Sequence, residues 1–235
     1  MNNQIDCVIL AGGLGTRLRS VLPDGMPKCL ADINGWPFID ILVENLQAAD
    51  FRHFVFCLGY GSDKIAKHLC ESWKGKSHNF SFSYERESLG TGGALKIAHE
   101  RNIEDEWLVG NWEMFFVFNG DTIAEVDFNL MLESHKSKDW LATVAYDYNK
   151  QCNAGVYILS RRIFKLMEKF YPPFSLDEVL GSRSEAAEMV NWYPVERFWD
   201  IGTPEGLEEL RRIMVDYSSV QRAPGEPGGR RLVTG

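Results

Sequence analysis

Cysteine is scarce in this sequence, and none of it stands in a metal-binding or redox arrangement. The five cysteines, at positions 7, 29, 57, 70 and 152, form no Cys-x-x-Cys pair, and the five histidines have no spacing that would join them in a metal site. A zinc module and a dithiol redox centre are therefore excluded. We expect buried, reduced thiols.

Long apolar runs are absent as well. The first residues, Met1 to Gln4, lack the basic start and apolar core of a signal peptide. No apolar run approaches the ~20 residues of a membrane span. The sequence therefore predicts a cytoplasmic enzyme with no membrane partner.

The chain is also short of positive charge. It has 25 Lys and Arg residues against 33 Asp and Glu residues, which makes the formal net charge -8. A nucleic-acid polymer is disfavoured as a partner, because binding to its backbone needs clustered cations. We expect phosphate binding to be local, and a homo-oligomer is left open.

Several common catalytic motifs are missing. The sequence has no Gly-x-Ser-x-Gly segment and no cysteine with an obvious histidine partner, so we expect no covalent nucleophile. It has no P-loop, and Leu18 stands where the dinucleotide-binding fingerprint needs its third glycine. These absences favour a direct displacement at phosphorus on a magnesium ion.

A phosphate-binding loop of another kind is present near the N-terminus. An unbroken apolar run from Cys7 to Ala11 predicts a central parallel strand. The segment Gly12 to Arg17 follows, and its three glycines let backbone N–H groups converge on a phosphate without Cβ obstruction. Thr16 and Arg17 add a hydroxyl donor and a fixed positive charge. A tight turn alone would not explain Arg17, so we predict a nucleoside triphosphate site.

Three further residues are candidates for the chemistry. Lys28 follows the loop closely and could neutralise charge on phosphates as they separate, although a lone lysine is more often a solvated one. Asp121 comes just after an apolar strand, at the sheet edge where ligands bind in α/β proteins, and we expect it to meet a cation rather than cap a helix. Asp200 repeats this pattern more weakly, with helix capping nearly as plausible.

The order of the predicted elements indicates the fold. Strands and helices alternate, which predicts a Rossmann-like α/β fold with a mixed, mainly parallel sheet flanked by helices. A second glycine-rich loop, Glu85 to Ala94, is expected to present free N–H groups at a helix start. We expect Asp127 to cap a helix and another helix to run from Ser160 to Phe170. Residues 1–217 would form one domain, and 218–235 a mobile Pro/Gly-rich tail.

These motifs, in this order, resemble those of the sugar-1-phosphate nucleotidylyltransferases. The stretch from Leu18 to Leu42 is most similar to the D-glycero-D-manno-heptose 1-phosphate guanylyltransferases, and mannose 1-phosphate guanylyltransferases are close competitors. Glucose 1-phosphate thymidylyl- and uridylyltransferases are a further alternative. The resemblance rests on Gly12–Leu18, Pro27-Lys28, Leu89–Ala94, Asn119–Asp121, Asn153–Tyr157 and Asp200–Pro204.

The resemblance implies a reaction and a set of roles. A nucleotidyl group would pass from an NTP, here GTP, to a sugar 1-phosphate, here the heptose 1-phosphate, with Mg²⁺ assisting and pyrophosphate leaving. Catalysis would fall to Arg17, Lys28 and Asp121, and metal binding to Asp121 and Asp200. Nucleotide binding would fall to Leu10, Ala11, Gly12, Gly13, Gly15, Thr16, Arg17, Glu85, Gly90, Thr91 and Gly92, and sugar binding to Asn119, Gly120, Asn153, Ala154 and Gly155.

Two departures from the family pattern stand out. Cys29 replaces a usual second proline, which is a small change. Between Tyr146 and Asn153 the family usually has a longer segment with a Glu-Lys pair whose lysine meets the sugar phosphate, whereas here Lys150 is the only lysine. A nucleotide-sensing module without turnover is therefore an alternative of another class. The retained phosphate and metal residues favour the enzyme.

Overall fold

The computed structural model describes residues 5–75, 79–104, 112–181 and 187–220. Its main sheet has the strand order β3-β2-β1-β4-β7-β6-β8, and β7 alone runs opposite to the other six. This is the mixed, mainly parallel sheet that the sequence predicts. The strands are β1 (Cys7–Ala11), β2 (His53–Leu58), β3 (Asn79–Tyr84), β4 (Met114–Asn119), β6 (Ala142–Asp147), β7 (Cys152–Ser160) and β8 (Val190–Pro194).

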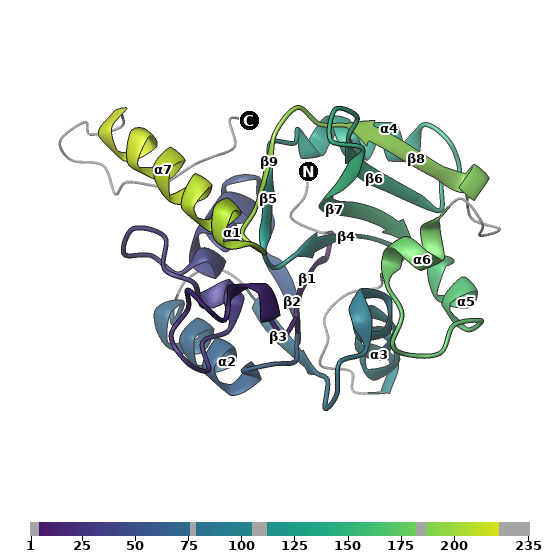
Figure 1. Cartoon of the computed structure of the whole chain (residues 1–235). Coiled ribbons are helices and arrows are strands. Elements are labelled where there is room, and N and C mark those ends of the chain that lie inside the picture. Colours follow the sequence, from purple (N-terminus) through teal and green to yellow (C-terminus); the bar gives the residue numbers. More distant parts are fainter. Residues whose placement is uncertain (1–4, 76–78, 105–111, 182–186, 221–235) are drawn as a thin grey trace.

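Helices cover both faces of the sheet (Figure 1). Because side chains alternate along a strand, Cys7, Ile9 and Ala11 of β1 join the hydrophobic core on one face, and Val8 and Leu10 join the core on the other. The first core is closed by α1 (Phe38–Ala48), α2 (Ser62–Ser72), α4 (Phe128–Lys136) and α7 (Pro204–Val220). The second core is closed by α3 (Gly90–Glu104), α5 (Ile163–Met167) and α6 (Leu176–Leu180).

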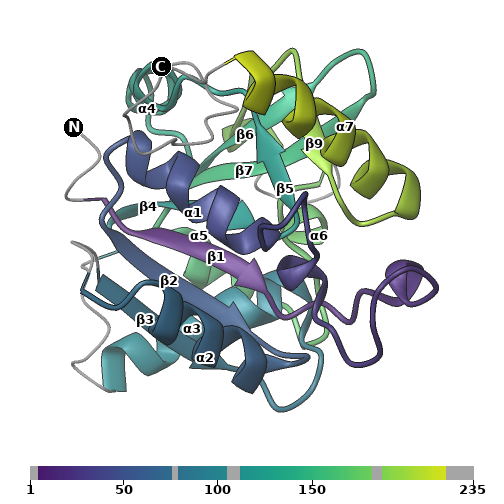
Figure 2. The ribbon, with the colours of Figure 1, turned by 90° about the vertical axis from the view of Figure 1, so that its left-hand side faces the viewer.

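Shorter elements connect the layers. Figure 2 shows α1 and α2 lying across the near face of the sheet, with α7 beside the small ribbon formed by β5 and β9. The ribbon strands are β5 (Thr122–Ala124) and β9 (Phe198–Asp200), and single 3₁₀ turns are η2 (Thr16–Leu18), η3 (Lys28–Leu30) and η4 (Ala187–Met189). No helix in the described parts of the chain is both long and apolar enough to cross a membrane.

Several local predictions can be checked. Asp127 caps α4 as expected, because its Oδ1 accepts the N–H groups of Asn129 and Leu130 at 3.0 Å. The helix expected from Ser160 to Phe170 is shorter at both ends. Ser160 still belongs to β7 and α5 begins at Ile163, while the N–H groups of Lys169 and Phe170 bond three residues back instead of four. The last helix continues through Val220, and the rest of the expected tail, 221–235, lies outside the described residues.

The cysteines are free, as predicted, but they are not all buried. Cys7, Cys29 and Cys57 are buried, Cys152 is half-buried and Cys70 is exposed. Burial raises the pKa of the Cys29 thiol to about 12, so this group stays protonated and unreactive at neutral pH.

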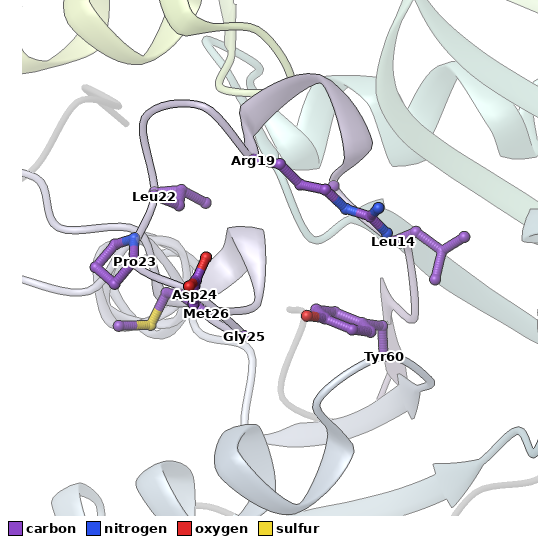
Figure 3. Close-up of a pocket in the computed structure, with 9 residues that line it drawn as sticks. Leu14, Arg19, Leu22, Pro23, Asp24, Gly25, Met26 and Tyr60 are labelled. Carbon is purple, nitrogen blue, oxygen red and sulfur yellow. The ribbon is translucent and has the colours of Figure 1, made fainter.

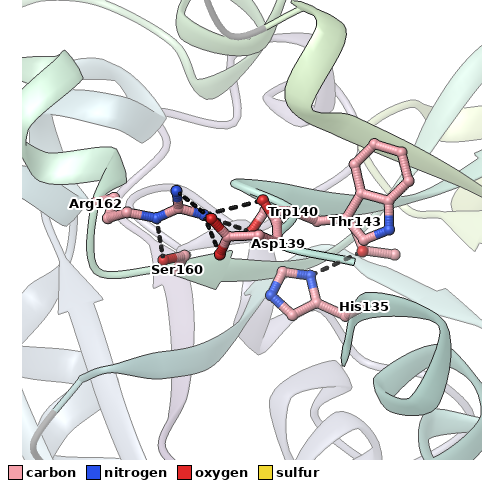
Figure 4. Close-up of polar contacts among 6 residues, drawn as sticks. All are labelled: His135, Asp139, Trp140, Thr143, Ser160 and Arg162. Atoms are coloured by element: carbon pink, nitrogen blue, oxygen red, sulfur yellow. Dashed lines mark hydrogen bonds and ion pairs between the residues drawn. The ribbon is translucent and has the colours of Figure 1, made fainter. Parts of the chain in front are cut away.

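A polar network holds the β7-β6-β8 side of the sheet (Figure 4). Arg162, just after β7, forms two 2.9 Å bonds to the carboxylate of Asp139, just before β6. Nearby, His135 of α4 shares a 2.8 Å hydrogen bond between its Nδ1 and the Thr143 hydroxyl. Burial, followed by the charge of Arg162, lowers the pKa of His135 to about 4, so this buried imidazole is neutral at pH 7.

Candidate functional site

The first glycine-rich loop lies at the carboxyl edge of the sheet and wraps around Lys28. A Cβ atom added to Gly13 or to Gly15 would lie 3.2 Å from the Lys28 side chain, and Gly15 has a φ of +58° that suits glycine. The glycines thus let the loop backbone approach the lysine closely. Gly120 N–H donates to the carbonyl of Leu10 at 2.9 Å, which joins the end of β1, just before this loop, to the end of β4.

Two cations and two carboxylates converge beside this loop. Lys28 Nζ forms an ion pair with Asp121 Oδ2, and Asp200 lies close enough to Asp121 to feel its charge. A Cβ atom on Gly202 would lie 2.9 Å from Arg17 Nη2 and 2.8 Å from Asp200 Oδ1, so the guanidinium and the carboxylate meet over this glycine. The predicted catalytic and metal residues therefore come together in one place.

The pKa of Asp200 reports this crowding. Burial raises it first and the negative charge of Asp121 raises it further, while the Gly202 N–H and the charges of Lys28 and Arg17 lower it. The Gly202 N–H donates to Asp200 Oδ1 at 2.6 Å. Two carboxylates this close cost free energy unless a cation is shared between them.

The β5–β9 ribbon is what brings the two carboxylates together. Thr122 pairs with Asp200 in the antiparallel register, and the N–H of Ile201 donates to the carbonyl of Asp121 at 2.9 Å. Sequence analysis missed this ribbon, because each strand has three residues and the two are separated by more than seventy positions. It converts two separate aspartates into one site.

The donor set suits a magnesium ion. Magnesium prefers oxygen ligands and is commonly held by one or two carboxylates, with substrate phosphates and water completing its shell. Within the described residues no group of three or more His, Cys, Asp and Glu side chains is placed to hold a metal ion. Asp121 and Asp200 fit a metal that arrives with phosphate oxygens.

Glu85 lies directly against the first loop. A Cβ atom on Gly12 would lie 1.7 Å from Glu85 Oε1, so only glycine leaves room for the carboxylate. Glu85 Oε2 accepts the N–H of Leu89 at 3.0 Å. Burial raises the pKa of Glu85 and this hydrogen bond lowers it in part. Two residues expected in the nucleotide site, seventy-three positions apart, are thus adjacent.

The second glycine-rich loop differs from its prediction. Its N–H groups are not free: those of Gly92 and Gly93 both donate to the carbonyl of Phe174, at 3.0 and 3.3 Å. The Thr91 hydroxyl accepts the N–H of Leu176 at 2.9 Å. A Cβ atom on Gly90 would lie 2.3 Å from the Phe174 carbonyl oxygen. The loop therefore docks the segment before α6, a contact without a sequence signal because the partners are about eighty residues apart.

The predicted sugar-binding residues form a second group. Gly155, with a φ of +70°, packs against Asn119 and Thr122, where an added Cβ would lie 3.0 Å from each side chain. Asn119 Oδ1 is buried and has no hydrogen-bond partner in the described part of the chain, so an acceptor is available there. Ala154 is fully buried in the core, which leaves only its backbone to face a ligand.

Asn153 leads to a residue that sequence analysis missed. Its Nδ2 donates to Asp177 Oδ1 at 2.9 Å, and its Oδ1 accepts the Tyr157 hydroxyl at 3.1 Å. Burial raises the pKa of the Asp177 carboxyl, and the hydrogen bond from Asn153 lowers it in part. Ser175 and Glu178 form a capping box around this position, so the local pattern accounted for the acidic residues without suggesting a site.

Lys150 lies on the tight hairpin between β6 and β7. Its Nζ is 4.2 Å from the centroid of the Phe198 ring, on the strand that ends at Asp200. The hairpin is held by Asp147 Oδ1, which accepts the N–H groups of Asn149 and Lys150 at 2.8 and 3.0 Å. The lysine therefore lies against β9, the strand that ends at Asp200.

A pocket of about 310 Å³ opens beside the first loop (Figure 3). Leu14, Arg19 and Tyr60 lie on one side of it, and the segment Leu22 to Met26 lies on the other. The opposite segment is anchored by Lys64, whose Nζ donates to the Gly25 carbonyl at 2.6 Å. The pocket therefore lies next to Gly15, at the end of the first glycine-rich loop.

Comparisons with known proteins show the family of this chain. Residues 6–169 match the family model described as nucleotidyl transferase. The chain is 30% identical to D-glycero-alpha-D-manno-heptose 1-phosphate guanylyltransferase of Campylobacter jejuni, across 86% of this chain and 96% of that protein. It is 28% identical to the enzyme of the same name from Aneurinibacillus thermoaerophilus, across 91% and 100%.

A solved structure gives the same result. HddC from Yersinia pseudotuberculosis, complexed with GMP-PN, superposes with a TM-score of 0.72 at 29% identity, across 89% of this chain and 99% of that chain. Substrates in this family are a nucleoside triphosphate and a sugar 1-phosphate. The chain belongs to the nucleotidyl transferase family, among the sugar-1-phosphate nucleotidylyltransferases that its motifs resemble.

Proposed function

We propose that this enzyme transfers GMP from GTP to D-glycero-α-D-manno-heptose 1-phosphate and releases pyrophosphate. The observation that carries the proposal is the convergence of Arg17, Lys28, Asp121 and Asp200 between the glycine loop and the Asn119–Gly155 group. The names of the Campylobacter and Aneurinibacillus relatives support the choice of base and sugar. The cytoplasm is the proposed location, because both substrates are charged metabolites held inside the cell.

The loop side of the site would hold GTP. Gly12, Gly13 and Gly15, with Thr16, present backbone donors to the phosphates, and Leu10 and Ala11 end the strand beneath them. Glu85 is an acceptor-only group when ionised, so it complements the two adjacent donors, N1–H and N2–H, on the edge of guanine. Gly90 and Gly92 pack against Phe174, and Thr91 accepts the N–H of Leu176, so these residues hold the second glycine-rich loop against the segment before α6.

The reaction would be a single in-line displacement. An oxygen of the sugar phosphate attacks the α-phosphorus of GTP, a new P–O bond forms, and the bond from that phosphorus to the bridging oxygen breaks. The electron pair and negative charge leave with pyrophosphate. Asp121 and Asp200 would hold Mg²⁺, which when bound neutralises charge on the phosphate oxygens. Arg17 and Lys28 stabilise charge as the leaving group departs.

Lys28 lies between Asp121 and the first glycine-rich loop. Its Nζ forms an ion pair with Asp121, and its side chain lies against Gly13 and Gly15. The ammonium would therefore reach phosphates held by this loop. Asn119, Gly120, Asn153 and Gly155 would then line the sugar, with Lys150 as the lysine on the side of the shortened hairpin.

A panel of substrates tests the proposal. Pyrophosphate release is measured with each of the four common NTPs and dTTP against heptose, mannose and glucose 1-phosphates, with and without Mg²⁺, and the sugar nucleotide formed is identified by mass. The proposal predicts the highest kcat/KM for GTP with the heptose. Higher kcat/KM for another base or sugar would replace the substrate assignment.

Mannose 1-phosphate is the second candidate sugar. The chain is 39% identical to mannose-1-phosphate guanyltransferase beta-B of Xenopus laevis over 166 residues, although these cover only 44% of that protein. Turnover of mannose 1-phosphate above that of the heptose would favour this alternative.

A further inference from the structure

Three aromatic side chains form an uncovered cluster beside the sugar half of the site. Tyr146 lies at the end of β6, with its ring centroid 5.1 Å from that of Tyr148 and 5.0 Å from that of Trp192. The interplanar angles are 74° and 68°, so both neighbours meet Tyr146 edge to face. We call these three residues the aromatic shelf.

The shelf is exposed although it is well ordered by contacts. Tyr148 is 59% exposed and Trp192 is 41% exposed, so part of each ring is open to a ligand. The Tyr148 hydroxyl donates to the Trp192 carbonyl at 3.3 Å, which fixes the ring across the edge strand β8. The tight hairpin between β6 and β7 turns back at once and leaves these rings uncovered.

The strand register places the shelf next to the predicted sugar residues. Tyr146 pairs directly with Asn153 across the antiparallel strands β6 and β7, and such partners project from the same face of a sheet. Trp192 pairs with Val144 on that face too, and parallel β6 and β8 end at the same sheet edge as β4. The shelf therefore continues the surface that begins at Asn153.

Distance along the sheet indicates which end of a sugar would reach it. Neighbouring strands are ~4.8 Å apart, so β6 lies about 10 Å and β8 about 14 Å from β4, the strand that delivers Asp121. A phosphate held beside Asp121 would direct its sugar over β7. The carbons farthest from the phosphate would then lie over β6 and β8.

The chemistry of the shelf suits an uncharged polyhydroxyl group. Aromatic faces bind the apolar C–H surface of a sugar, while Asn153 and Asp177 beside them offer amide and carboxylate groups to hydroxyls. Asp147 and Asp177 make this corner acidic, which disfavours a second phosphate. A carbohydrate fits these groups better than another anion.

We propose that the aromatic shelf binds the exocyclic carbon chain of the acceptor sugar and so selects pyranose 1-phosphates that carry such a chain over those that lack it. This inference rests on the proposed transfer to a sugar 1-phosphate and adds a specificity-determining surface to it. Trp192 and Tyr148 contact the far end of the sugar and do not contact the reacting phosphates.

Direct binding tests this inference. α-D-Lyxopyranose 1-phosphate, which is mannose 1-phosphate without the exocyclic carbon, is compared with mannose 1-phosphate and D-glycero-α-D-manno-heptose 1-phosphate. Each is titrated by calorimetry into the full chain, saturated with Mg²⁺ and a non-cleavable GTP analogue. Trp192→Ala should weaken binding of the heptose and mannose phosphates about ten-fold and leave binding of the lyxose phosphate and of the GTP analogue unchanged. Trp192→Phe, which keeps a ring, should restore most of the affinity.

A matched variant and two contrary results complete the test. Tyr171→Ala removes an 89% exposed ring elsewhere and should change none of the affinities. The shelf would be overturned if wild type and Trp192→Ala bound each of the three sugar phosphates with the same affinity. It would also be overturned if Trp192→Ala changed only the sedimentation of the protein, because Trp192 would then be a contact between copies. Binding of none of the sugar phosphates by wild type would instead overturn the proposed function and the shelf with it.

Discussion

Thr122 and Asp200 lie directly opposite each other in the β5–β9 ribbon, and this pairing sets Asp200 beside Asp121, the residue before Thr122. The negative charge of Asp121 raises the pKa of Asp200, and the positive charges of Lys28 and Arg17 lower it. The ribbon therefore places the two carboxylates beside each other and beside the cations Lys28 and Arg17. A metal ion with phosphates would complete this group of charges.

Replacing Asp200 with Asn should abolish most of the turnover without unfolding the protein. The amide oxygen can still accept the Gly202 N–H, but the charge that would hold Mg²⁺ is lost. We expect kcat to fall on the order of 10²–10³-fold, as for other losses of preorganised charge stabilisation. Asp139→Asn is the control, because Asp139 pairs with Arg162 away from the site. Equal effects of the two changes would remove Asp200 from the mechanism.

Glu85→Gln should reduce the preference for guanine. The carboxylate can accept both N1–H and N2–H, whereas the amide can accept only with its oxygen. Hydrogen bonds to a charged group contribute about 1.5–3 kcal/mol, so kcat/KM for GTP should fall about 10–100-fold. ITP lacks the N2 amino group, so kcat/KM for ITP should fall less than kcat/KM for GTP. If the ratio of the two kcat/KM values were the same in wild type and Glu85→Gln, Glu85 would not contact the base edge.

Gly90→Ala should destabilise the fold more than a glycine substitution of similar backbone strain. Gly90 has a φ of +73°, and its added Cβ would lie 2.3 Å from the Phe174 carbonyl oxygen. Gly35, with a φ of +92°, has no atom within 4 Å of such a Cβ. Urea unfolding should show Gly90→Ala to be about 1–3 kcal/mol less stable than Gly35→Ala. Equal losses would mean that the Phe174 segment moves away freely.

The buried His135 should make stability depend on pH. Its pKa is lowered to about 4 in the folded protein, against about 6.5 when unfolded. The unfolded chain therefore binds the extra proton between these values, and the free energy of unfolding falls as the pH decreases from about 6.5 to 4. The full shift corresponds to roughly 3–4 kcal/mol of unfolding free energy. Urea unfolding should show that the free energy of unfolding differs less between pH 7 and pH 5 in His135→Gln than in wild type.

The same comparison isolates His135 from an opposing group. Burial raises the pKa of Asp6 to about 6, so this residue makes folding less favourable as the pH rises from about 4 to 6. Asp6 is present in both proteins, and its contribution cancels in the difference between wild type and His135→Gln. Identical pH profiles for the two proteins would show that His135 is not buried in its neutral form.

Much of the fold could be predicted because it depends on local patterns. The apolar run that begins at Cys7, the capping residue Asp127 and the alternation of strands with helices are each visible in a few adjacent residues. The family motifs then identified the family correctly. The first glycine-rich loop was also predicted from adjacent residues, because its glycines directly follow the apolar strand.

The remaining features depend on contacts between distant segments. The Gly92 and Gly93 N–H groups were expected to be free, but Phe174 accepts from both, and no pattern near either residue announces this contact. The β5–β9 ribbon is too short to show a period. Asp177 was missed because an acidic residue in the first turn of a helix is common, and only the fold brings it to Asn153.

The most direct test of the account is pyrophosphate release by the full chain with GTP, D-glycero-α-D-manno-heptose 1-phosphate and Mg²⁺. We predict release only when all three are present, with equimolar GDP-heptose formed and both products lost in Asp121→Asn. GTP binding without release across the whole panel of sugar phosphates would contradict the account and favour a nucleotide-sensing module.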